Sequence, residues 1–244
     1  MDVVKRCFLS GLLTGFFALM QAGHAGATSD VMVGNATGQL PVVQGPTEAS
    51  VDMTPCRFSM TLAQDQWLQF NAPDLIFIAS QQLPDPSSAP HLWQAPRSIS
   101  YEWNFENSAN MTHPWFGIMC ENVGSFSSLT TQPPADDTIE LQQLREANDR
   151  KCPATLTEVG WRPTPLAGDP QTYAFESLEG AKSSGFIIGY HHKHQPQFSR
   201  IAFCLVQGEQ VLIGAAESGS SIPLAISAEG FEHIKTAVRS IAFQ

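Results

Sequence analysis

The sequence lacks the short motifs by which many enzymes and ligand-binding proteins are recognised. It contains no G-x-S-x-G elbow, no H-E-x-x-H zinc helix, no glycine-rich phosphate loop and no EF-hand loop. It also contains no C-x-x-C pair, which argues against a structural zinc site and against a thioredoxin-like redox site. Any catalytic site would have to be assembled from residues that carry no local signature.

Basic residues are also scarce. The 244 residues include 13 Lys and Arg against 23 Asp and Glu, and without residues 1–27 the counts are 11 and 22, a net charge of −11. Such a chain repels phosphate groups, so nucleic acid and anionic lipid are poor partner candidates. A basic protein partner would be attracted instead.

Long apolar runs are absent except at the N-terminus. Cys7 to Met20 forms a mostly apolar run of 14 residues, too short to cross a bilayer as a helix. Lys5 and Arg6 precede it, and Ala25-Gly26-Ala27 follows as a cleavage site. We expect residues 1–27 to be a cleavable signal peptide, the protein to be periplasmic or secreted, and the mature chain to have no membrane span.

Four cysteines remain after this cleavage: Cys56, Cys120, Cys152 and Cys204. An even number of cysteines in an exported chain predicts two structural disulfides. Four cysteines allow three pairings, and the sequence does not choose among them.

Two segments follow the signal peptide. Residues 28–54 are rich in Gly and Pro with little periodicity, which indicates a flexible N-terminal arm. Residues 55–244 alternate between short apolar runs and turn signals, and we expect them to form a single globular domain.

Within that domain, strands outnumber helices. Residues 67–70, 75–78, 99–105 and 185–192 have the character of strands, and residues 200–206 and 210–215 form the clearest hairpin. Helices are indicated near residues 137–152, and after Ser227, where apolar residues recur at helical spacing. We therefore expect an α+β fold, in which an antiparallel sheet is covered by helices on one face.

The last 60 or so residues resemble a known type of exported protein. Ile201–Val206 and Val211–Gly214 form a hairpin, and an amphipathic helix follows and ends in Ala237–Phe243. This pattern resembles the PsbP-like α/β/α sandwich proteins. The resemblance implies an accessory, stabilising or binding role, and some exported bacterial proteins of similar appearance antagonise toxins. The type shares no catalytic signature, so the resemblance assigns no functional residue.

Histidines form the most conspicuous polar cluster. In Tyr190-His191-His192-Lys193-His194, a strand would direct His192 and His194 to one face at a spacing that suits Zn²⁺ or Cu²⁺. A metal site needs a third ligand, which only His91, His113, His233 or an acid could supply. We favour an exposed strand end, and we expect no cofactor.

Three functions remain open. We favour a non-catalytic exported protein that binds a protein partner, such as a periplasmic immunity or accessory protein. The alternatives are a secreted hydrolase or effector whose site has no local motif, and a periplasmic metal-binding protein that uses His192 and His194.

Overall fold

A computed structural model describes residues 31–34, 36–85, 87–94, 103–106, 111–129, 138–180, 182–192, 196–218 and 223–244. The expected signal peptide, residues 1–27, lies outside the described residues. The buried apolar residues run from Val33 to Phe243 and form one cluster.

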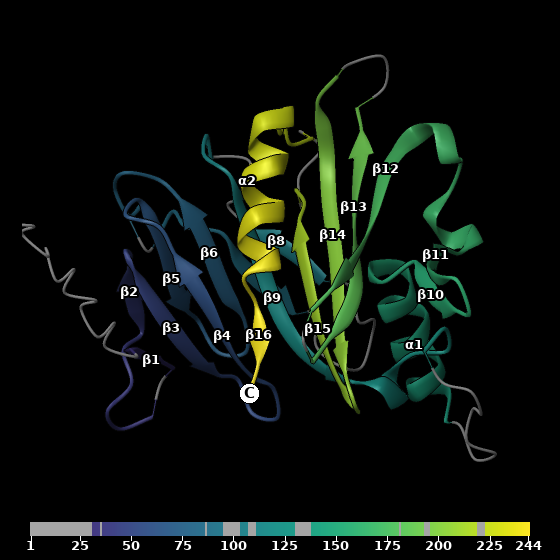
Figure 1. The fold of residues 1–244 in the computed structure, drawn as a ribbon, viewed down its shortest axis with the longest axis horizontal. Coiled ribbons are helices and arrows are strands. Elements are labelled where there is room, and N and C mark those ends of the chain that lie inside the picture. The colour runs from purple at the N-terminus through teal and green to yellow at the C-terminus, as the bar shows by residue number, and fades with distance from the viewer. Residues whose placement is uncertain are drawn as a thin grey trace, which may run out of the picture.

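The largest element is an eight-stranded antiparallel sheet through the middle of the molecule (Figure 1). Several of its strands are buried on both faces, as in Leu75-Ile76-Phe77-Ile78, and they are near-continuous apolar runs. In spatial order the strands are β12 (Tyr173–Glu179), β13 (Ser184–His191), β14 (Phe198–Gln207), β15 (Gln210–Ala216), β9 (Trp115–Asn122), β6 (Leu75–Ala79), β5 (Gln66–Phe70) and β2 (Val42–Gln44).

A second sheet and a helix cover one face of this sheet. The four-stranded sheet has the order β1 (Val31–Val33), β3 (Thr47–Asp52), β4 (Arg57–Leu62) and β16 (Ala242–Phe243). Helix α2 (Ala228–Arg239) lies beside this second sheet and leads into β16 (Figure 1). The apolar side of α2 packs on the large sheet, where the rings of Phe231 and Phe198 are 4.5 Å apart.

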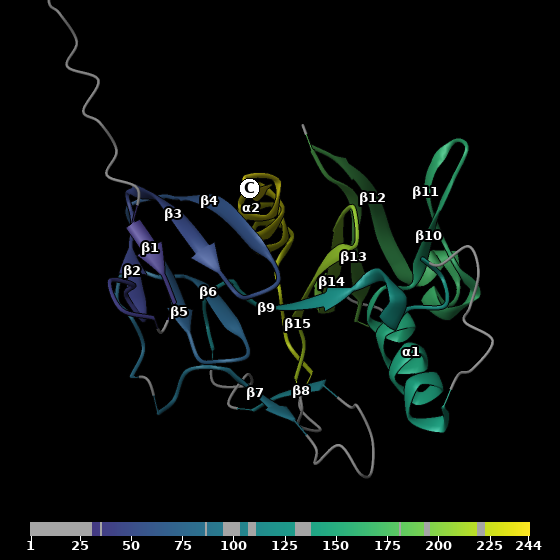
Figure 2. The same ribbon diagram turned by 90° about the horizontal axis from the view of Figure 1, so that it is seen from below.

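Three smaller elements lie on the opposite face. The hairpin of β7 (His91–Gln94) and β8 (Trp103–Glu106) contributes Phe105, whose ring is 5.3 Å from that of Trp115. The hairpin of β10 (Ala154–Thr157) and β11 (Gly160–Pro163) contributes Trp161, which is 5.5 Å from Phe186. Helix α1 (Ile139–Lys151) is the third element, and Figure 2 shows it on the side away from α2.

Helix α1 packs through polar contacts, because its buried residues are Arg145, Asn148 and Asp149. Arg145 Nε and Asn148 Nδ2 donate to the carbonyls of Gly124 and Ser125 at 2.9 and 3.0 Å. These two carbonyls lie in a short 3-10 turn, Val123–Ser125; similar turns occur at Pro165–Ala167 and Pro170–Thr172. The helix therefore fixes a loop rather than covering the core with an apolar stripe.

The expected fold class, an α+β arrangement of helices packed on a sheet, is wrong. Strands account for 46% of the described residues and helices for 19%, so the described structure is mostly β and closer to a β-sandwich. The two helices also lie on opposite faces of the large sheet (Figure 2). The sequence-based interpretation missed the second sheet because two of its four strands, β1 and β3, fall inside residues 28–54.

The structure also differs from the flexible arm expected at residues 28–54. Val33, Ala49 and Val51 are almost fully buried in this region. The strands there are only three to six residues long and are separated by Gly- and Pro-containing turns, so their alternation is too short to stand out.

The predicted disulfides are confirmed, with pairings that the sequence left open. Cys56 pairs with Cys120 and joins the small sheet to β9, and Cys152 pairs with Cys204 and joins the end of α1 to β14. The Cα atoms are 5.7 and 5.8 Å apart, which suits a disulfide. The two bonds thus connect layers on opposite faces of the large sheet.

Candidate functional site

His192 lies immediately after β13, and its backbone N–H donates to the Gln197 carbonyl at 2.8 Å. Its ring is half-buried, and Nδ1 has no hydrogen-bond partner among the described residues. The other expected ligand, His194, lies outside the described residues. Within the described part of the chain, no group of three or more His, Cys, Asp or Glu side chains is placed to hold a metal.

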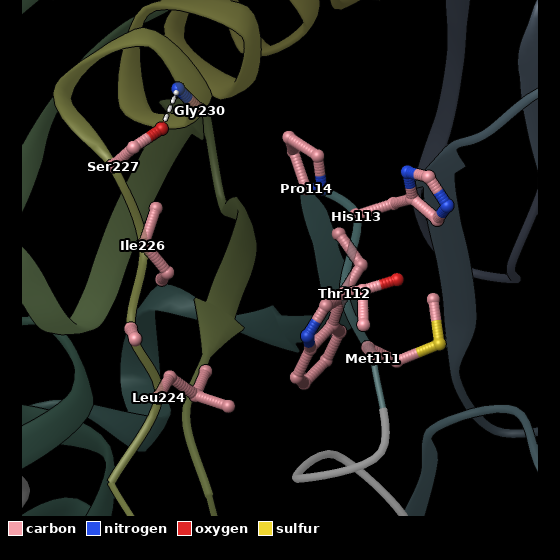
Figure 3. Close-up of a pocket in the computed structure, with 10 residues that line it drawn as sticks. Met111, Thr112, His113, Pro114, Leu224, Ile226, Ser227 and Gly230 are labelled. Atoms are coloured by element: carbon pink, nitrogen blue, oxygen red, sulfur yellow. Dashed lines mark hydrogen bonds between the residues drawn. The ribbon is translucent and has the colours of Figure 1, made fainter.

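A pocket of about 230 Å³ lies near the same end of the sheet, between the segments Met111–Trp115 and Leu224–Ser227 (Figure 3). The side chains of Leu224 and Trp115 are almost fully buried there. The Ser227 hydroxyl is engaged, because Oγ accepts the Gly230 N–H at 3.0 Å as the N-cap of α2. Figure 3 shows the His113 ring directed away from Ser227. The pocket therefore does not pair a nucleophile with a base.

A partly buried ion cluster connects α1 to the sheet. Glu217, just after β15, accepts Lys151 from the end of α1 and lies 3.4 Å from Arg200 Nε. Arg200 also stacks on the Tyr190 ring, 4.7 Å from its centroid. Burial raises the pKa of the Tyr190 phenol, so it stays protonated at neutral pH. The Lys151–Glu217 pair joins the end of α1 to the segment after β15.

Ion pairs and hydrogen bonds within the chain, some buried and some exposed, engage most of the described basic side chains. Glu217 and Glu176 each bind two basic groups. The engaged side chains are Arg57 with Asp52, Arg145 with a carbonyl, Arg150 with Glu146, Lys151 and Arg200 with Glu217, and Lys235 and Arg239 with Glu176. Few basic groups are left to offset the surplus of exposed carboxylates.

Three exposed carboxylates lie on the N-terminal strands and the turns between them. Glu48 lies on β3, Asp65 lies in the turn between β4 and β5, and Asp85 lies in the loop after β6. Backbone hydrogen bonds join the turn that carries Asp65 to neighbouring segments: Gly45 N–H donates to the Gln66 carbonyl at 2.9 Å and Ser80 N–H to the Asp65 carbonyl at 2.7 Å. We call Glu48, Asp65 and Asp85 the acidic corner.

Basic residues are scarce in the part of the chain that carries the acidic corner. Among the described residues from 31 to 94 the acids are Glu48, Asp52, Asp65, Asp74 and Asp85, and the only base is Arg57, which pairs with Asp52 at 3.1 Å. The Ser87 backbone N–H and hydroxyl bind the Asp85 carboxylate and lower its pKa, so it is ionised at neutral pH. The sequence indicated the acidic balance, but not where the surplus gathers.

No described helix has the length and apolar content that a membrane span requires. The two disulfides are compatible with an exported protein. The PsbP-like resemblance stays a prediction. Comparison of the chain with family models, with curated proteins and with solved structures found no match.

Proposed function

We propose that this is an exported, non-catalytic protein that binds a basic protein partner through the acidic corner. The observation that carries the proposal is the distribution of charge. Most described basic side chains are paired with carboxylates or carbonyls of the same chain, while Glu48, Asp65 and Asp85 are exposed in residues 31 to 94, where the one described base, Arg57, is paired with Asp52.

Electrostatics explains how such a surface selects a partner. A surface that carries several carboxylates raises the local concentration of positively charged molecules and speeds their encounter with the protein. The same charges repel acidic proteins, so the surface also rejects wrong partners. A periplasmic immunity or accessory protein, held rigid by two disulfides, would use this selectivity against one basic target.

The polar groups of the described residues that could take part in catalysis are engaged in holding the fold. Ser227 is occupied as a helix cap, the four mature cysteines are in disulfides, and Glu217 is neutralised by two basic groups. Each of these groups serves the fold, and none is matched with a base or nucleophile across a cleft.

The first prediction tests the acidic corner. The mature protein is used to capture its partner from the native envelope, and association is then measured with the purified partner at low ionic strength. Asp65→Lys should lower the association rate constant about tenfold, because it replaces an attractive charge by a repulsive one. Asp65 is exposed, so the variant should fold normally.

Glu209→Lys is the matched control. Glu209 is also exposed, but it lies in the β14–β15 turn, next to Gln210, whose side chain donates to the Pro55 carbonyl at the other end of the β3–β4 pair. Glu209→Lys makes the same change of charge as Asp65→Lys and should alter the association rate constant much less. Equal effects of the two variants would contradict the acidic corner, and turnover of a cell-wall, lipid or peptide substrate by the pure protein would contradict the whole proposal.

A further inference from the structure

The pocket between the segments Met111–Trp115 and Leu224–Ser227 is closed at one end by the first turn of α2 (Figure 3). Gly230 lies in this turn, and a Cβ atom at its position would be 3.4 Å from both Pro114 Cγ and Ile226 Cγ2. The two walls therefore come together at Gly230, and the pocket opens between them. Its volume of about 230 Å³ far exceeds the roughly 30 Å³ that one water molecule takes up in the liquid.

The lining of the pocket carries little charge. Met111, Leu224 and Ile226 are apolar, and the described lining residues include no Asp, Glu, Lys or Arg. His113 is the one titratable side chain among them, and it is exposed. Glu229 already offers a carboxylate to the positive end of α2. Because a charged group would lose its hydration here without gaining an opposite charge, the lining favours an uncharged molecule with an apolar body.

Trp115 supplies a hydrogen-bond donor that the fold does not use. Its indole Nε1 has no acceptor in the part of the chain that the structure describes, although the residue is only 3% exposed. A buried indole N–H usually finds a partner. Trp67 Nε1 donates to the Ser80 carbonyl at 3.0 Å, and Trp161 Nε1 donates to Ser184 Oγ at 3.2 Å.

The free N–H of Trp115 borders the pocket. The ring is held edge-on against Phe105, with the centroids 5.3 Å apart. Nε1 is not among the unpaired polar atoms that are sealed from open space, and the pocket is the open space that Trp115 lines. An unpaired buried donor costs free energy, so an acceptor placed beside it would be stabilised by the new hydrogen bond.

We propose that this pocket binds a small uncharged molecule that has an apolar body and a carbonyl oxygen. The oxygen accepts the Trp115 N–H, and the body lies against Leu224 and Ile226. Small-molecule sites commonly combine a mostly apolar lining with a few polar groups that fix the orientation of the ligand. The site differs from the acidic corner in its residues and in its chemistry, so it adds a second binding function to the one proposed above.

The second prediction uses cyclohexanone as the probe and follows the indole N–H signals of the ¹⁵N-labelled mature protein by NMR. The Trp115 signal, assigned through its proximity to the Phe105 ring, should shift and saturate as cyclohexanone is added. Trp115→Phe keeps an aromatic ring and removes the donor. It should weaken binding roughly three- to tenfold, the effect of one lost hydrogen bond, measured from the backbone amide signals of Ala225 and Ile226.

Trp161→Phe is the matched control, because Trp161 is buried to a similar degree, 2% exposed, and its N–H is bonded within the fold. It should leave the affinity for cyclohexanone unchanged. The inference would be overturned by the absence of a saturable shift, or by equal losses of affinity in Trp115→Phe and Trp161→Phe. Tighter binding of sodium cyclohexanecarboxylate than of cyclohexanone would contradict an uncharged ligand. The experiment contains no protein partner, and Asp65→Lys should bind cyclohexanone as the unsubstituted protein does, so the two proposals fail separately.

Discussion

At the scale of single residues, Asp74 carries the clearest electrostatic cost. It is 2% exposed, and its Oδ2 has no hydrogen-bond partner among the described residues. Gln69 Oε1 and Asn71 Nδ2, in the same β5–β6 region, are also without partners. Burial raises the pKa of the Asp74 carboxyl, and hydrogen bonds and His91 only partly oppose this shift.

The third prediction follows from the sign of that shift. A carboxyl whose pKa is higher in the folded protein binds its proton more tightly there, so the free energy of unfolding falls as pH rises above the ordinary value of 3.8. Asp74→Asn keeps the shape of the side chain and removes the buried charge. Thermal unfolding should show a higher Tm for the variant at pH 7, with the advantage disappearing below pH 3.8.

Asp65→Asn is the control, since the Asp65 side chain is exposed. It should change the Tm little at either pH. A loss of stability in Asp74→Asn at pH 7 would show instead that the ionised carboxylate is held by favourable contacts.

At the scale of elements, the sequence predicted those whose signals are local. The predicted hairpin of β14 and β15 is confirmed, and its turn contains Gly208 at φ +56°. The predicted helix α2 after Ser227 is also confirmed, with this serine as its N-cap. Both signals lie within a few residues of the element that they specify. Helix α1 is confirmed as well, and its cap is Thr138.

Elements that depend on distant partners were not predicted. Strands β1 to β3 are short and become strands by pairing, for example Glu48 with Thr61 on β4. The place of Glu48 also depends on this pairing, since it sets β3 beside β4. The disulfide pairings depend on which layers of the fold pack together. The local sequence around each cysteine does not contain this information.

The fourth prediction concerns the cap of α2. The Ser227 hydroxyl accepts the Gly230 N–H, which would otherwise lack a partner at the start of the helix. Ser227→Ala should lower the free energy of unfolding by about 1 kcal/mol, measured by urea denaturation. Ser227→Asp should retain most of the stability, because a carboxylate also caps the helix and suits its positive end. If Asp were as destabilising as Ala, the capping role would be wrong.

At the scale of the whole molecule, charge and rigidity act together. Three layers are tied by two disulfides, and the described basic side chains mostly serve to hold these layers. Among the described residues from 31 to 94, five acidic residues accompany a single base, Arg57, which is paired with Asp52. This arrangement favours a preformed binding surface over a site that must reorganise.

The measurement that tests this account most directly is the salt dependence of binding to the purified partner. Both rate constants are measured from low to high ionic strength. The account predicts that the association rate constant falls steeply as salt rises, because screening weakens steering by the acidic corner, while the dissociation rate constant changes less. An association rate constant that does not respond to salt would contradict the proposal that a basic partner is drawn to Glu48, Asp65 and Asp85.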